Sequence, residues 1–239
     1  MQRSRVARLQ RVLAVAVVVL ILKVTASVML GYRDYFPANF DNDFLSGRES
    51  YFAGGYQWAF YAHIVSGPIS LVLALLLVSE SFRLRFPVWH RSLGKAQVAT
   101  VLVLLAPSGL WMAWYARTGP IAGMGFAVLA FATGVCVLMG WRTAVQRRFV
   151  EHRRWMWRCF WLLCSAVIVR VIGGLATVLL WGDAWIYPLT AWCSWLVPLT
   201  AFELLAVIRR RCRQAEIRSE RCRAPSITLS PHAVEAVVQ

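Results

Sequence analysis

Residues 58–78, WAFYAHIVSGPISLVLALLLV, contain no lysine, arginine, aspartate or glutamate. An α-helix rises about 1.5 Å per residue, so roughly 20 residues cross the ~30 Å hydrocarbon core of a bilayer. In a soluble domain, a run of this length would be broken by a polar face. The stretch therefore predicts a membrane-spanning helix.

Five other stretches share this length and apolar character. The chain has 239 residues and is 59% hydrophobic, as six such helices require. The sequence thus predicts an all-α fold, an integral membrane bundle of six transmembrane helices. Their approximate ranges are Leu9–Gly31, Trp58–Val78, Gln97–Ala116, Ile121–Trp141, Trp157–Trp181 and Trp185–Ile208.

The positive charge is concentrated in alternate connections. The net charge is +15, and its arginines gather in residues 3–11, 83–95, 142–154 and 209–223. The opposite connections carry only Arg33, Arg48 and Arg117. Such a bias places both termini in the cytoplasm of a multi-pass protein, which we expect in a bacterial inner (plasma) membrane. Its predicted partners are the lipid bilayer and anionic lipid head groups on the cytoplasmic side, not nucleic acid.

Three regions follow from this pattern. Residues 1–8 form a basic cytoplasmic N-terminus, residues 9–208 the transmembrane domain, and residues 209–239 a basic cytoplasmic tail. The tail is polar and contains Pro225 and Pro231, so it is predicted to be disordered. The connection 32–57 is rich in Gly, Asn and Pro and is predicted to be irregular.

The first span has an alternative interpretation. Basic residues, the apolar stretch Val12–Leu22 and the small residues Thr25-Ala26-Ser27 are also typical of a signal peptide. Cleavage there would leave five spans in the same orientation. We favour an uncleaved anchor because the apolar character continues to Gly31 and no clean Ala-x-Ala site is present.

An ionisable side chain inside a membrane span is energetically unfavourable, so its presence there often indicates a function. By helix rise, Lys23, His63 and Arg170 fall in the outer half of the bilayer, whereas Glu203 lies near the inner end of the last span. The outer three residues are candidates for an anion or substrate site, with Glu203 as a further ligand-site candidate. Alternatively, Lys23 extends outward to the interface and Arg170 bonds to backbone carbonyls.

Two further histidines lie at similar depth near the cytoplasmic starts of their spans. Each begins a basic motif, His90-Arg91-Ser92-Leu93-Gly94-Lys95 and His152-Arg153-Arg154-Trp155-Met156. Two imidazoles at one level are suited to the axial positions of a b-type haem, with Arg91 and Arg153 on its propionates. The same residues could instead bind another ligand such as a lipid phosphate, or be solvated interfacial side chains.

Motifs of soluble enzyme chemistry are missing from the sequence. It contains no P-loop, Rossmann fingerprint, Gly-x-Ser-x-Gly elbow or His-Glu-x-x-His helix, and no metal-ligand spacing. No catalytic residue is therefore assigned, and the one enzyme class left open is a membrane oxidoreductase subunit.

An ordered series of motifs resembles a known family. In chain order these are His63-Ile64, Gly67-Pro68, Pro87, His90-Arg91, Leu93-Gly94, Ser108-Gly109-Leu110, Gly125-Phe126, His152-Arg153-Arg154-Trp155-Met156, Arg158, Arg170, Trp195 and Glu203. The series, over about 58–205, resembles the bacterial domain-of-unknown-function family 2306, a group of predicted multi-spanning membrane proteins. The resemblance implies topology and location but supplies no activity.

The sequence therefore predicts an integral inner-membrane protein of unknown activity with a buried ligand site. One alternative is a b-type haem or quinone-linked membrane redox subunit. Another is a small anion transporter or a lipid-interacting protein.

Overall fold

A computed structural model describes residues 2–42, 44–116, 119–181 and 184–223. Within these ranges every regular element is helical and no strand occurs. Six helical stretches are long and apolar enough to cross a membrane, which confirms the predicted fold class. They are Arg8–Tyr35, Glu49–Val78, Pro87–Trp114, Pro120–Val145, Phe149–Val178 and Ile186–Ser219. The chain divides into two compact units, Met1–Leu199 and Thr200–Gln239.

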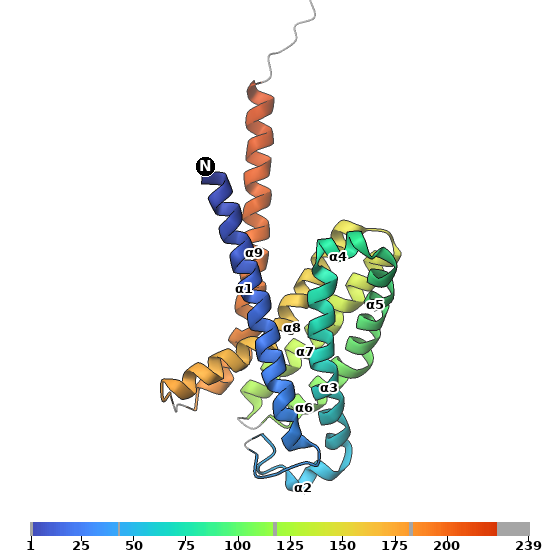
Figure 1. The fold of residues 1–239 in the computed structure, drawn as a ribbon, viewed down its shortest axis with the longest axis vertical. Helices are drawn as coiled ribbons and strands as arrows, with labels where there is room; N and C mark the ends of the chain where they lie inside the picture. Colours follow the sequence, from blue (N-terminus) through green and yellow to red (C-terminus); the bar gives the residue numbers. More distant parts are fainter. Residues whose placement is uncertain (1, 43, 117–118, 182–183, 224–239) are drawn as a thin grey trace, which may run out of the picture. The chain divides into compact units, whose positions relative to one another are not determined.

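The core of the first unit is built by α3 (Gln57–Val78), α6 (Ala106–Trp114), α7 (Pro120–Val145) and α8 (Phe149–Val178). Figure 1 shows α3, α7 and α8 side by side, and the contacts of α8 with both other helices agree. Small residues permit close approach between these helices. At Gly123 of α7, for example, an added Cβ would lie 2.7 Å from the backbone oxygen of Ala113.

The third span is not one regular helix. It consists of α5 (Pro87–Ala99), a π-helical turn η3 (Thr100–Leu105) and α6. The cause lies at Pro107, whose ring nitrogen has no proton to donate to the preceding turn. The backbone rewinds ahead of it, so that the N–H of Ala106 reaches back five residues to the carbonyl of Val101. The π-helical turn η3 therefore sets the direction of α6, which lines the cavity described below.

Helix α1 (Gln2–Gly31) is held loosely by comparison. Among its described side chains only Ile21 and Thr25 are buried. The remaining surface is apolar over most of its length, as expected of a helix that meets acyl chains. α1 contacts α3 and α8, so one of its faces still belongs to the bundle.

The connection between the first two spans is more ordered than the sequence predicted. It contains a 3₁₀ turn η1 (Tyr32–Tyr35), a short α2 (Glu49–Tyr51) and a π turn η2 (Phe52–Tyr56). Its Leu45, Phe52 and Tyr56 are buried together with Phe60 and Ile64 of α3. The prediction of irregular structure missed this because it weighed the Gly, Asn and Pro residues and not the aromatic ones.

The connection between α3 and α5 holds a further short helix, α4 (Glu80–Arg85). Its N-terminus is capped by Ser79, whose Oγ accepts a hydrogen bond from the N–H of Phe82 at 3.4 Å. A salt bridge of 3.1 Å joins Arg83 to Glu80 within it.

The last helix, α9 (Ile186–Arg223), contributes its beginning to the first unit. There, Trp192 donates from Nε1 to the carbonyl of Ile121 at 3.0 Å, and Trp195 is buried. The second unit is described to Arg223 and continues the helix. The tail was predicted to be disordered from residue 209, and for 209–223 this differs from the structure. The stretch is rich in Arg, which favours helix, and residues 224–239 lie outside the described range.

Candidate ligand cavity

The first unit contains a cavity of about 580 Å³. Its walls come from the end of α1, from the connection 32–56 and from α3, α6, α7 and α8, together with Tyr187 at the start of α9. Most of the lining is aliphatic or aromatic. Three ionisable nitrogen side chains interrupt it: Arg48, His63 and Arg170.

An aromatic cap covers one end of this cavity. We use this name for Tyr35, Phe44, Phe52, Tyr56 and Phe60, of which the first four belong to the connection and the last to α3. Phe60 lies at the centre, with ring centroids 5.2 Å from Tyr35, 5.6 Å from Phe44 and 5.7 Å from Phe52. Contacts of this geometry add to the burial of the rings themselves. The cap is therefore a packed structure and not a loose loop.

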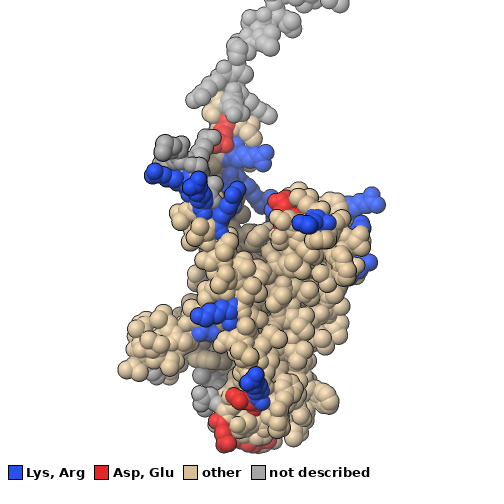
Figure 2. Space-filling view, viewed as in Figure 1, with Lys and Arg blue, Asp and Glu red and all other residues tan. Residues whose placement is uncertain are grey.

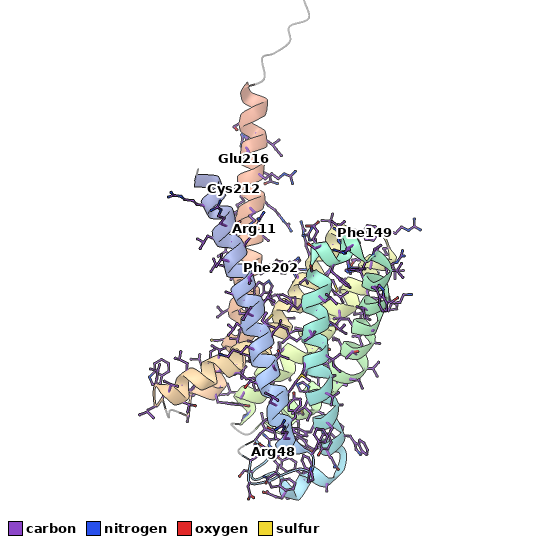
Figure 3. The ribbon with its side chains drawn as sticks, viewed as in Figure 1. Arg11, Arg48, Phe149, Phe202, Cys212 and Glu216 are labelled. Atoms are coloured by element: carbon purple, nitrogen blue, oxygen red, sulfur yellow. The ribbon has the colours of Figure 1, made fainter. Side chains whose placement is uncertain are left out.

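Arg48 is buried within this cap, with 6% of its surface exposed. Its Nε donates to the carbonyl of Phe44 at 2.8 Å, and its Nη1 donates to the Tyr56 hydroxyl at 2.7 Å. The same Nη1 lies 3.2 Å from the carbonyl of Tyr115, beyond the C-terminal end of α6. The guanidinium carbon also lies 4.7 Å from the centroid of the Phe44 ring. Figure 3 shows Arg48 at the end of α1 where the connection folds.

The positive charge of Arg48 has no carboxylate partner among the described residues. Its acceptors are two carbonyls and the hydroxyls of Tyr51 and Tyr56, which hold the group but do not neutralise it. A guanidinium has five N–H donors, and no described atom accepts from Nη2. Because Arg48 also lines the cavity, this nitrogen is a candidate for contact with a ligand.

His63 of α3 lies in the opposite wall and is fixed by α6. Its Nδ1 is 3.2 Å from the Ser108 Oγ. The Ser108 hydroxyl proton is directed to the carbonyl of Leu104 at 2.5 Å, so we assign the Nδ1 proton of His63 as the donor to Ser108. The ring rests on Gly109, where a Cβ would lie 3.3 Å from its Cε1. The dipeptide Ser108-Gly109 thus sets the position of His63.

Arg170 of α8 lines the same cavity, and its Nη1 donates to the carbonyl of Ala166 at 2.9 Å. This hydrogen bond agrees with the alternative raised from the sequence, in which Arg170 donates to backbone carbonyls. The side chain is nevertheless exposed, and it lies within electrostatic range of Tyr32, Tyr35 and His63. The bond to Ala166 therefore anchors the guanidinium but does not remove it from the cavity.

The predicted outer set is brought together only in part. His63 and Arg170 share the cavity, but Lys23 is exposed on α1 and lines neither this cavity nor the groove beside it. The second cation of the cavity is Arg48, which lies in the connection predicted to be irregular and was not among the predicted site residues. Glu203 belongs to the second unit and is not among the residues that line the cavity.

The inner pair, His90 and His152, does not line the cavity. The Nδ1 of His152 lies 2.8 Å from the carbonyl of Gly140, while the Nδ1 of His90 is buried with no hydrogen-bond partner in the described part of the chain. The two rings lie within electrostatic range of each other. Of the two arginines proposed for haem propionates, Arg153 lies 3.9 Å from Glu80 in an exposed ion pair, and Arg91 is exposed.

These features define a multi-pass integral membrane protein with a cavity inside its bundle. A family described as "Predicted membrane protein (DUF2306)" matches residues 60–206, more than half of the chain, and the protein belongs to this family. The resemblance found in the motifs is thereby confirmed. Neither a protein of curated function nor a solved structure matches the chain.

Removal of the Tyr56 hydroxyl should loosen the aromatic cap. We expect Tyr56→Phe to lower the free energy of unfolding by about 1.5–3 kcal/mol, the range for hydrogen bonds to charged groups. The matched control is Tyr61→Phe, which deletes a neutral bond of 2.8 Å to the carbonyl of Tyr35 and should cost about 1 kcal/mol. The free energies of unfolding of both variants and the wild type are measured in detergent. Equal losses would show that Arg48 does not depend on Tyr56.

The haem hypothesis for His90 and His152 is tested by an absorption spectrum of the purified protein, oxidised and reduced, after expression with a haem supply. It predicts a Soret band that disappears in His90→Ala and His152→Ala and persists in His63→Ala, because His63 lies in the other site. A flat visible spectrum at full haem supply would contradict it.

Proposed function

We propose that this protein binds, within the bilayer, a small molecule that has an apolar body and an anionic end. The observation that supports this most strongly is Arg48, a buried cation in the cavity wall. Burial of a charge without an opposite charge is unfavourable. An anion in the cavity would supply the missing charge and an acceptor for Nη2. Arg170 would add a second positive charge to the same space.

The rest of the lining supports the apolar body. The walls are mostly aliphatic and aromatic, and the described residues that line the cavity include no aspartate or glutamate. A volume of about 580 Å³ lies within the range of ~300–1,000 Å³ typical of small-molecule sites. A few convergent polar groups in an apolar pocket are how such sites orient a ligand. Of the interpretations raised from the sequence, this cavity favours an anion or substrate site, which belongs to the alternative of a small anion transporter or lipid-interacting protein.

We place the protein in the bacterial inner membrane with both termini cytoplasmic. In the first unit, exposed arginines lie around α4, the start of α5 and the α7–α8 connection, whereas Asp34, Asp41 and Glu49 lie in the connection 32–56. Figure 2 shows most of the red surface of this unit at one end, and both colours at the other end. Arginine-rich connections on one side support a cytoplasmic position for that side.

Binding is tested with a photoreactive single-chain carboxylate in proteoliposomes, compared with the alcohol of the same chain. Wild-type protein should be labelled at cavity residues and should prefer the carboxylate. In Arg48→Gln the preference should fall by roughly tenfold or more, since a charge-assisted hydrogen bond is worth about 1.5–3 kcal/mol. The control is Arg33→Gln, which removes an exposed arginine of the same connection that does not line the cavity.

Two outcomes would overturn the proposal. One is the absence of saturable labelling of the wild type by either probe. The other is equal labelling by carboxylate and alcohol in the wild type, a comparison that does not depend on whether Arg48→Gln folds.

Orientation is tested with a membrane-impermeant maleimide on spheroplasts. The tail cysteines Cys212 and Cys222 should react only after lysis, while a cysteine introduced by Ser46→Cys, at an exposed position of the connection, should react before it. Labelling of the tail on intact spheroplasts would reverse the proposed topology.

A further inference from the structure

The cavity has a neighbour that shares part of its wall. A groove lies between α1 and α8, lined on one side by Val24, Ser27 and Val28 and on the other by Arg170, Val171, Gly174 and Leu175. Val28 and Arg170 line both the groove and the cavity. The two spaces therefore meet at these residues.

The groove is open because its walls carry small residues. A Cβ added at Gly174 would meet no atom within 4 Å, and the same is true of Gly173 beside it. Ser27 faces Gly174 across the groove with a similarly small side chain. Because both helices are long and apolar enough to cross a membrane and expose large apolar side chains, we expect the groove to face lipid.

Arg170 stands at the junction of the two spaces. Only its Nη1 has an acceptor among the described residues, the carbonyl of Ala166. A guanidinium at a lipid-facing opening is costly unless an anion or water accompanies it. An anionic head group that moved from the groove into the cavity would meet Arg170 first and Arg48 afterwards.

We propose that the ligand is a single-chain amphiphile with a carboxylate or phosphate head, and that it reaches the cavity sideways from the bilayer, between α1 and α8. This inference rests on the proposed function and specifies its ligand and route. The cavity volume suits a drug-sized molecule, which is the size of one acyl chain with a small head, whereas a two-chain phospholipid is much larger. The loose packing of α1 lets this side of the bundle admit a chain.

The route is tested by narrowing the groove. Gly174→Phe places a large side chain in the opening, and Gly173→Phe makes the same change one residue earlier on α8, at a position that does not line the groove. Both variants are reconstituted in vesicles that contain the photoreactive single-chain carboxylate, and labelling of cavity residues is followed over time. We expect Gly174→Phe to slow labelling at least tenfold with the same final level, and Gly173→Phe to match the wild type.

The outcomes separate the two proposals. If the wild type is labelled and both variants keep its rate, the route is wrong while binding stands. If the wild type is not labelled at all, the proposed function fails as well. A two-chain phospholipid probe that labels the cavity as well as the single-chain probe would overturn the ligand class.

The source of the anionic head is resolved by two probes of equal chain length. One carries a carboxylate, as in a fatty acid, and the other a phosphate, as in a lysophospholipid. Arg170→Gln should weaken labelling by whichever head the site prefers, and should leave the alcohol unchanged. Equal weakening of the charged probes and the alcohol would exclude a role for Arg170 in head-group recognition.

Discussion

A guanidinium removed from water must find its acceptors within the protein, and at Arg48 this requirement organises one end of the bundle. Its partners are the carbonyls of Phe44 and Tyr115 and the hydroxyls of Tyr51 and Tyr56. They come from the connection, from the turn that leads into α3 and from the end of α6. One side chain thus joins three segments, and the aromatic rings pack around it. The aromatic cap stays over the cavity because these acceptors hold the Arg48 guanidinium in place.

The walls depend on constraints of a different kind. Pro107 forces the backbone of the third span to rewind, and the helix that follows presents Ser108 and Gly109 to His63. The Ser108 hydroxyl donates its proton to a carbonyl of its own helix, so it can only accept a hydrogen bond from His63. This requirement fixes the orientation of the His63 ring. Arg170 is tethered to the preceding turn of α8. Each ionisable group of the cavity is therefore anchored within the protein, Arg48 and Arg170 on backbone carbonyls and His63 on the Ser108 hydroxyl. This anchoring lets each group bind a ligand without losing its position.

The sequence was a good guide to the helices and a poor guide to which residues meet. Length and hydropathy located six spans because a helix satisfies its backbone hydrogen bonds within its own segment, as hydrocarbon requires. In wholly apolar spans the sequence does not indicate which side of a helix faces its neighbours. Lys23 was therefore grouped with His63 and Arg170, although it does not line the cavity. Arg48 was missed because an arginine in a polar connection is usually solvated. Its burial depends on aromatic residues far apart in the chain, and the density of Tyr and Phe in 32–61 was the available signal.

The region matched by the family, 60–206, includes His63 and Arg170 but not Arg48, nor the connection that forms most of the aromatic cap. Of the two arginines proposed to recognise the ligand, one thus lies inside the part of the chain that defines the family and one outside it. A relative could keep the shared helices, exchange this cover for another and accept a different molecule. The division separates a common scaffold from an interchangeable specificity element, and membership of the family does not by itself imply a common ligand.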